Sequence, residues 1–528
     1  MQICLKAKEF DGVLVILAPQ AMTDPTGVAE RLTEILKGET QPVFTAWMGG
    51  VDVSRGREIL NQAGIPTYDT PEQAIRAFMY MYEYCRNMEL LQEIPPKLSR
   101  SFSFNRDEAR RTIERGLEGK EGSLTEVEAK ALLSAYRIPV APTEVVTSAE
   151  EAVSLAQQIG YPLVMKIHSR DILHKSEANG VQLDLRSESD VRRSYEKLME
   201  AAAAYNPQAQ ILGVTLQPMI QRPDFEIMLG AKRDENFGPV ILFGMRGVLA
   251  EILEDRALAL PPLNRLLARR LTEKTRVSSL LRGYRNRPAA NLELLEEMII
   301  GLSQLLVDFP EILELDINPV IVHGATSSAV DARLILRPSE FPSPKHLVIS
   351  PYPGHYESRT VTTGGLSIFL RPIKPEDAPL FVDLFQSLSP TSIYYRFFSP
   401  LKSPSPSMLA RFTQIDYDRE IALVALEDGE QERMLGVARV IADPDGRRAE
   451  FSVLVGDPWQ GKGVGAKLLE KCLAIARERA IETVCGTVLP ENTQMLALGR
   501  KLGFRVSRTP EPGEFELSAD LRSLFFEG

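Results

Sequence analysis

Residues 450–465 read EFSVLVGDPWQGKGVG, and this stretch decides the fold of the C-terminal part of the chain. Its first six residues predict a strand, and a helix is predicted to follow, with Val464, Leu468 and Leu469 at helical spacing. A glycine-rich turn between a strand and a helix start exposes several backbone N–H groups at a positive dipole end. Such a turn suits a diphosphate, although an ordinary strand-to-helix loop would carry the same pattern.

The segments around this stretch favour the first interpretation. Residues 460–465 resemble the Gln/Arg-x-x-Gly-x-Gly/Ala signature of the GNAT acetyltransferases, and the neighbouring segments follow that family's order: 367–372, 375–378, 421–426, 434–441, 483–488, 492–495 and 501–504. The resemblance implies a GNAT N-acetyltransferase domain over residues 366–528, built as a mixed sheet flanked by helices.

The same resemblance implies an acetyl-CoA site and assigns residues to it. The backbone N–H of Val455 is expected to hold the thioester carbonyl, as a preorganised donor for a developing oxyanion. The other residues expected to bind the cofactor are Gln460, Gly461, Lys462, Gly463, Val464, Gly465 and Asn492.

Attack on a thioester needs a neutral amine, and a lysine amine has a pKa near ~10.4, so a base must take a proton. Glu450 is the candidate, acting directly or through one water, because it begins the strand that leads to the glycine-rich turn. The alternative is a solvated carboxylate at a strand start. Many family members carry, at the position of Gly499, a tyrosine that serves as the acid for the leaving thiolate. No residue of this chain is assigned to that role.

The middle of the chain contains a second set of polar residues at predicted strand ends. Residues 162–167 predict a strand that carries Lys166, and residues 314–319 and 330–333 bring Asn318 and Asp331 to adjacent strands. An amide and a carboxylate together suit magnesium, which takes oxygen ligands. Taken singly, each is more often a solvated strand end.

Together these stretches resemble the ATP-grasp domain of NDP-forming acyl-CoA synthetases, over residues 115–337. The resemblance implies that Lys166 contacts ATP phosphates, that Gln217 and Met219 lie beside the adenine, and that Asn318 and Asp331 hold Mg²⁺. It also places Asp316 and His174 near the transferred phosphoryl group. Residues 245–247 read MRG where the synthetases have consecutive glycines, which favours nucleotide binding over turnover.

The first 95 residues alternate strand and helix signals, which indicates a parallel, doubly wound sheet. They resemble the end of the flavodoxin-like CoA-ligase portion of the same synthetases. Prolines punctuate residues 338–353 and Gly364-Gly365 follows, which predicts a linker over residues 338–365. The whole arrangement is similar to the bacterial Pat-type protein lysine acetyltransferases. In that group a CoA-binding domain would precede the segment that corresponds to residues 1–95, and we expect a partner chain or a longer protein to supply it here.

Composition limits the classes of partner. The chain has 528 residues with 61 Lys and Arg against 71 Asp and Glu, a net charge of −10, which disfavours nucleic acid and anionic membranes. Its four cysteines form no CxxC pair, which favours a reducing, cytoplasmic setting. The first of its five histidines is His168, so residues 1–95 contain no histidine to phosphorylate.

The leading hypothesis is therefore an enzyme that moves acetyl from acetyl-CoA to a lysine of a protein, with a metabolic enzyme such as an acyl-CoA synthetase as acceptor. The synthetase-like module would regulate or oligomerise it. The alternatives are an NDP-forming acyl-CoA synthetase acting with a partner chain, and a non-catalytic acyl-CoA or nucleotide sensor; a small-molecule amine also remains open as acceptor.

Overall fold

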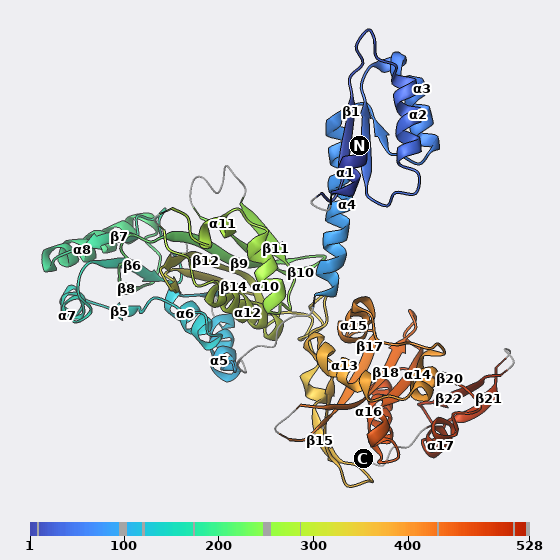
Figure 1. The fold of residues 1–528 in the computed structure, drawn as a ribbon. Helices are drawn as coiled ribbons and strands as arrows, with labels where there is room; N and C mark the ends of the chain where they lie inside the picture. Colours follow the sequence, from blue (N-terminus) through green and yellow to red (C-terminus); the bar gives the residue numbers. More distant parts are fainter. Residues whose placement is uncertain are drawn as a thin grey trace. The chain divides into compact units, whose positions relative to one another are not determined.

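A computed structural model describes residues 1–7, 10–93, 103–118, 122–172, 175–246, 255–285, 287–429, 432–509 and 513–523 (Figure 1). The chain divides into two compact units, Met1–Glu93 and Ile94–Gly528. Within the described residues, no helix combines the length and the apolarity that crossing a bilayer requires.

The first unit is a three-stranded parallel sheet in the order β1-β2-β3, as the alternation of its elements predicts. All five residues of the central strand β2 are buried, because helices cover both faces of a parallel sheet. The elements are α1 (Gln2–Lys6), β1 (Val13–Leu17), α2 (Pro25–Ile35), β2 (Val43–Trp47), η1 (Gly50–Val53), α3 (Ser54–Gln62), β3 (Thr67–Tyr68) and α4 (Pro71–Gln92).

The second unit begins with residues 103–336, which form two sheets and the helices that pack on them. The smaller is an antiparallel sheet in the order β5-β8-β6-β7, and it shares one apolar cluster with α7 and α8. Its elements are β5 (Glu144–Val146), α7 (Ala149–Ile159), β6 (Leu163–Ser169), β7 (Val181–Leu185), α8 (Glu188–Tyr205) and β8 (Ile211–Pro218).

The larger sheet runs β11-β10-β9-β12-β14-β4, and β13 pairs with β12. Register opposes Ile317 of β12 to Ala332 of β14, so Asn318 and Asp331 become neighbours, as predicted from the sequence. The elements are α5 (Arg106–Leu117), β4 (Ser123–Leu124), α6 (Glu126–Ala135), β9 (Phe225–Asp234), β10 (Gly238–Met245), β11 (Arg256–Ala259), α10 (Arg265–Glu273), α11 (Val277–Leu281), α12 (Leu292–Asp308), β12 (Ile312–His323), β13 (Thr326–Ala329) and β14 (Ala332–Leu336).

The C-terminal part is an eight-stranded mixed sheet in the order β15-β16-β17-β18-β19-β20-β22-β21. Alternate residues of β17 face opposite sides: Ala422 and Val424 pack with α13, whereas Leu423 and Ala425 pack with α16. The strands are β15 (Ser358–Val361), β16 (Ser367–Pro372), β17 (Glu420–Glu427), β18 (Met434–Ala442), β19 (Arg448–Val455), β20 (Thr483–Val488), β21 (Arg505–Arg508) and β22 (Phe515–Asp520).

The helices of this part are η2 (Gly354–Tyr356), η3 (Pro375–Asp377), α13 (Ala378–Gln386), α14 (Pro390–Phe397), α15 (Pro406–Thr413), η4 (Asp457–Trp459), α16 (Val464–Glu478) and α17 (Thr493–Lys501). Residues 358–361, which lie in the expected linker, instead form the strand β15 and pair with β16. The linker prediction missed this strand because it ran past the last proline of the cluster, Pro353, to the glycine pair at residues 364 and 365.

One pair of strands in the mixed sheet is parallel, and it separates early. β19 and β20 pair only through Arg448–Thr483, Ala449–Val484 and Glu450–Cys485. β20 then continues along β22 to Val488, while β19 continues along β18 to Val455. Beyond Glu450 no strand pairing joins β19 to β20, and this unpaired stretch between the two strands is called the opening below.

Candidate functional site

The turn after β19 has the conformation that only glycine adopts without strain. Gly461 has φ +71° and Gly463 has φ +87°, and Gly463 is the N-cap of α16. Gly465 lies in the first turn of this helix, where a Cβ would be 3.3 Å from the side chain of Val455. Since the first N–H groups of a helix lack partners within it, residues 461–465 present backbone donors next to β19.

The amide of Val455 points into the opening between β19 and β20. Gly456 donates its N–H to the carbonyl of Leu435 in β18, over 3.0 Å. Because N–H groups alternate in direction along a strand, the N–H of Val455 points away from β18, to the side that β20 has left. This orientation suits the predicted role of that N–H as a donor to a thioester oxygen.

The side chain of Gln460 braces the turn. Its Nε2 donates to the carbonyl of Val455 over 3.1 Å, to Asp457 over 3.0 Å and to Ser392 over 3.2 Å. Asp457 in turn accepts from the backbone N–H of Ser389 and the hydroxyl of Ser392, at the start of α14. Gln460 thus ties the turn to β19 and to α14 at once.

The remaining residues predicted to bind the cofactor have different surroundings. Lys462 is exposed, and Val464 is buried in the core on the α16 side of the sheet. Asn492 caps α17, with its Oδ1 accepting the N–H of Met495 over 3.1 Å. Their contacts with a cofactor remain predictions.

Glu450 occupies the last paired position before β19 and β20 separate, opposite Cys485, and its side chain is exposed. Alternation places it on the same face as Ser452 and Leu454, the face that α13, α14 and α15 cover. The predicted base is therefore at the mouth of the opening, on the side opposite α16.

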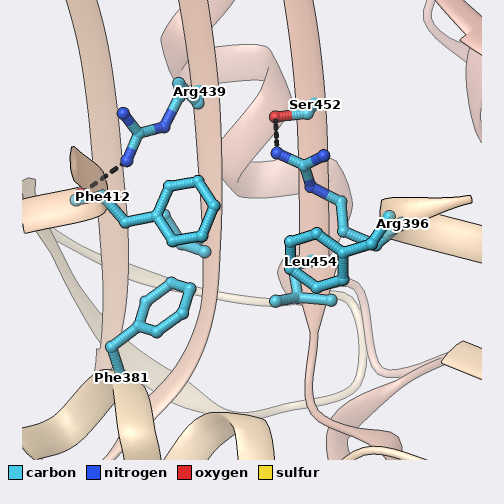
Figure 2. Close-up of a pocket in the computed structure, with 8 residues that line it drawn as sticks. Phe381, Arg396, Phe412, Arg439, Ser452 and Leu454 are labelled. Carbon is cyan, nitrogen blue, oxygen red and sulfur yellow. Dashed lines mark hydrogen bonds between the residues drawn. The ribbon is translucent and has the colours of Figure 1, made fainter. Parts of the chain in front are cut away.

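A small pocket on this same face is lined by Phe381, Arg396, Phe397, Phe412, Val437, Arg439, Ser452 and Leu454 (Figure 2). Arg439 is neutralised by Glu420, at 2.6 Å. Among the residues that the structure describes, the guanidinium of Arg396 instead donates to a hydroxyl, Ser452 Oγ, over 2.9 Å. Burial, together with Arg439, lowers the pKa of Arg396 to about 10, and the charge of Glu450 opposes this shift.

Arg396 was not identified from the sequence. It lies in α14, about 55 residues before Glu450, and nothing in the run around it distinguishes it from an ordinary surface arginine. Only the packing of α14 against β19 brings it beside Ser452.

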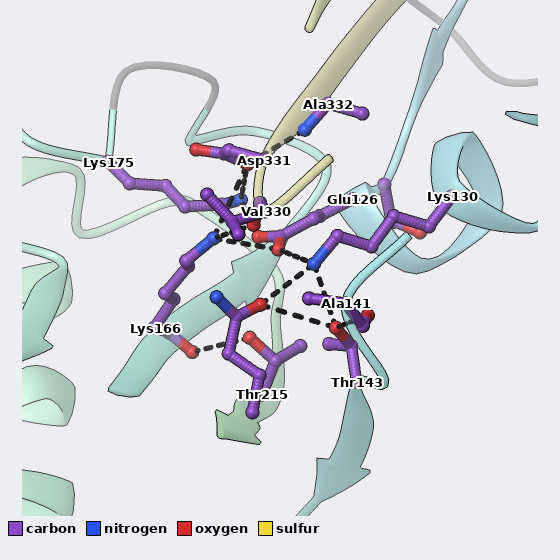
Figure 3. Close-up of polar contacts among 12 residues, drawn as sticks. Glu126, Lys130, Ala141, Thr143, Lys166, Lys175, Thr215, Val330, Asp331 and Ala332 are labelled. Carbon is purple, nitrogen blue, oxygen red and sulfur yellow. Dashed lines mark hydrogen bonds and ion pairs between the residues drawn. The ribbon is translucent and has the colours of Figure 1, made fainter. Parts of the chain in front are cut away.

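A second group of charges lies between the two sheets of residues 103–336 (Figure 3). The carboxylate of Glu126, 1% exposed, accepts from Lys130 and Lys166 over 2.8 Å each and from Lys175 over 2.5 Å. Burial disfavours its charge, but the three ammonium groups outweigh burial and hold the pKa of Glu126 well below its usual range. Burial also lowers the pKa of Lys130 to about 8.

Two residues predicted to bind the nucleotide, Lys166 and Gln217, meet at this group, and Met219 lies two residues after Gln217. Lys166 also donates to the carbonyl of Val330 over 2.8 Å and lies 3.6 Å from Asp331. Gln217 accepts from Lys130 over 2.8 Å. Met219 follows β8, and its N–H donates to the carbonyl of Pro162.

The predicted metal ligands Asn318 and Asp331 are adjacent, and Asn318 has an oxygen atom that is free to bind a cation. The N–H of Asn318 donates to the carbonyl of Asp331 over 3.3 Å, while its buried Oδ1 has no hydrogen-bond partner among the described residues. Burial, followed by the charges of Asp331 and Glu314, raises the pKa of Asp316. An unpaired amide oxygen beside carboxylates fits a cation held jointly with phosphate oxygens.

No cluster of three or more His, Cys, Asp or Glu side chains suited to a metal occurs in the described part of the chain. Such a cation would therefore depend on Asn318, Asp331 and the nucleotide rather than on a complete protein cage. His174 and Gly247 lie outside the described residues.

Two family models match the chain. Residues 115–336 match the ATP-grasp domain, and residues 389–504 match the acetyltransferase (GNAT) family. These matches confirm the predicted α/β fold class for both regions.

Curated relatives divide between the same two regions. Acetate–CoA ligase [ADP-forming] I of Archaeoglobus fulgidus is 33% identical over 64% of this chain and 47% of its own length. The β subunit of the corresponding ligase of Pyrococcus furiosus is 36% identical over 43% of this chain and 97% of its own length. An acetyltransferase of Pseudomonas aeruginosa is 32% identical over 28% of this chain and 80% of its own length.

Among solved structures, the GNAT domain of S. lividans PAT is 33% identical, with a TM-score of 0.31, over 32% of this chain and 99% of that domain. The chain spans about half the length of the first curated relatives it matches. It therefore belongs to the ATP-grasp family of the ADP-forming acetate–CoA ligase β subunits through residues 115–336, and to the GNAT acetyltransferase family through residues 389–504.

Proposed function

We propose that residues 366–528 transfer an acetyl group from acetyl-CoA to the side-chain amine of a protein lysine. The observation that carries this proposal is the opening between β19 and β20, which has Glu450 at its last paired position and the glycine turn 461–465 at its far end. Diphosphate bound at the turn would place the acyl thioester along β19, in reach of the N–H of Val455.

The reaction needs two proton transfers and one exchange of bonds. Glu450 takes a proton from the lysine ammonium, directly or through a water, and the neutral amine attacks the thioester carbonyl. The N–H of Val455 stabilises the oxyanion that forms. The oxyanion then re-forms the carbonyl as the C–S bond breaks, CoA leaves as the thiolate, and the second proton of the amine passes to solvent.

The acceptor we propose is a lysine of a metabolic enzyme such as an acyl-CoA synthetase. Support comes from the match of residues 389–504 to the GNAT family and from the exposed carboxylate of Glu450, which an acceptor side chain can approach from solvent. Four free cysteines suit a reducing cytoplasm, where we place the reaction.

For the ATP-grasp region we propose ATP binding as a regulatory input. Lys166 and Lys175 would contact the phosphates, Gln217 and Met219 would lie near the adenine, and Asn318 with Asp331 would hold Mg²⁺. A bound Mg²⁺ would neutralise phosphate charge. The lysines already converge on one carboxylate, so their ammonium groups are oriented for an anion before it binds.

The test is transfer of labelled acetyl from acetyl-CoA to a purified acyl-CoA synthetase. Glu450→Gln keeps the shape of the side chain and removes the base, and it should lower kcat by about 10²–10⁴. Glu427→Gln is the matched control, because Glu427 is also an exposed strand residue and makes only a 3.6 Å pair with Arg433. Equal rates for the two variants would remove Glu450 from the mechanism.

The relatives favour one second candidate. Because the chain covers 97% of a ligase β subunit at 36% identity, it can be proposed as the nucleotide-binding partner of a separate CoA-binding chain. ADP release that depends on ATP, CoA and acetate together, measured with the chain alone and with an α subunit added, tests this activity. No release in either mixture would eliminate it.

A further inference from the structure

We propose that the turn between β15 and β16, residues 362–365, holds the diphosphate-binding turn in its binding conformation and so sets the affinity for acyl-CoA. The inference rests on the acetyl-CoA site proposed above. It extends that site to a segment well before residue 389, where the family match begins.

The two turns touch at their backbones. Gly364 donates its N–H to the carbonyl of Lys462 over 3.2 Å. A Cβ on Gly364 would lie only 2.7 Å from that oxygen, and a Cβ on Gly463 would lie 2.4 Å from the hydroxyl of Thr363. Both positions therefore need glycine for the close approach itself.

The β15–β16 turn is rigid enough to act as a support. Thr362, 4% exposed, accepts the N–H of Gly365 on its carbonyl over 2.9 Å and the N–H of Leu366 on its hydroxyl over 3.2 Å. Its own N–H donates to the carbonyl of Leu366 over 2.9 Å. The strands on either side are paired up to Val361 and Ser367.

This contact fixes the direction of one proposed diphosphate donor. In a trans peptide unit the carbonyl of residue i and the N–H of residue i+1 point in opposite directions. Because the carbonyl of Lys462 points at Gly364, the N–H of Gly463 points away from the β15–β16 turn. Gly364 thus acts as a positioning residue, through Lys462, for an N–H at the start of α16.

A methyl group at position 364 should separate the turns and rotate this peptide unit. We expect Gly364→Ala to weaken CoA and acetyl-CoA binding about tenfold, the effect of losing roughly one well-directed hydrogen bond to a charged group. Its kcat at saturating acetyl-CoA should stay close to wild type. Binding of S-acetylpantetheine, which has no diphosphate, should not change.

The experiment is calorimetric titration of the full chain with CoA and with S-acetylpantetheine. Gly429→Ala is the matched control, since a Cβ there meets nothing within 4 Å and its backbone is not left-handed. Thr363→Ala is the second variant, which keeps the main-chain contacts and removes the hydroxyl beside Gly463 together with the γ-methyl group. It should weaken CoA binding by about two- to fivefold even if Gly364→Ala fails to fold.

The outcomes separate this inference from the function on which it rests. If the wild-type chain binds no CoA, the proposed acetyl-CoA site is wrong. If wild type binds CoA and both folded variants bind it within twofold of wild type, the supporting role of the turn is wrong. An equal loss for S-acetylpantetheine would also overturn it, because the effect would then not involve the diphosphate.

Discussion

Replacing Glu126 by Gln should strongly destabilise the ATP-grasp region, because Lys130 loses the carboxylate it pairs with. Among the described residues, Lys166 and Lys175 keep only Asp331 as a counter-ion, at 3.6 and 3.5 Å. The side chains of Lys130, Lys166 and Lys175 are only 4%, 6% and 13% exposed, so water replaces little of the lost charge. Removing one partner of a buried ion pair costs about 3–5 kcal/mol. At 1.4 kcal/mol per factor of ten, local opening should become roughly 10² to 4 × 10³ times more frequent.

Tryptophan fluorescence cannot measure this change, since the two tryptophans, Trp47 and Trp459, lie outside residues 115–336. Hydrogen exchange of the backbone amides of β6 and β8 can measure the increase in local opening. Glu188→Gln is the matched control: Glu188 is the first residue of α8 as Glu126 is of α6, but its pair with Arg192 is half exposed and should contribute about 0.5 kcal/mol or less. Exchange rates for Glu126→Gln within tenfold of the control would refute the reasoning.

Two further changes test the charges at each site. Folding lowers the pKa of Lys130 from 10.5 to about 8, so between these two pH values the unfolded chain holds a proton that the folded chain lacks, and the stability contributed by this group rises with pH. Denaturant titrations of wild type and Lys130→Met should therefore show that the difference between their free energies of unfolding increases by at most about 3 kcal/mol from pH 8 to pH 10.5. Asp377→Asn should lower the free energy of unfolding of the C-terminal part by about 3–5 kcal/mol, because it breaks a buried pair with Arg371 that has two hydrogen bonds of 2.7 Å. Asp428→Asn, at an exposed pair, should lower it by less than about 0.5 kcal/mol. Equal stabilities of the two variants, measured by unfolding followed through Trp459 fluorescence, would contradict this prediction.

The strands and the glycine turn could be predicted because their signals are local. A continuous apolar run gives β1, and alternation with flanking glycines gives β19 and the turn with Gly461 and Gly463. The adjacency of Asn318 and Asp331 was also predicted, although Asn318 lies within β12, at a break in its register with β9, and not at the end of the strand. Each of these features depends on residues close in the sequence.

The features that the sequence did not reveal depend on contacts between distant segments. Glu126 looks like an ordinary acid in the first turn of a helix, and only the packing of α6 against β6 gives it Lys166 as a partner 40 residues away. Arg396 likewise becomes notable only beside Ser452. The strand β15 is four residues long and was hidden within a segment whose prolines indicated a linker.

The position of β15 has a practical consequence for anyone who dissects this protein. A fragment begun at residue 389 would match the acetyltransferase family in full, yet it would lack β15, β16 and the hairpin between them. It would also present β17 as a bare edge, ready to pair with another molecule and aggregate. Expression of the C-terminal domain alone should therefore start upstream of Ser358, so that the catalytic part is released together with its first two strands.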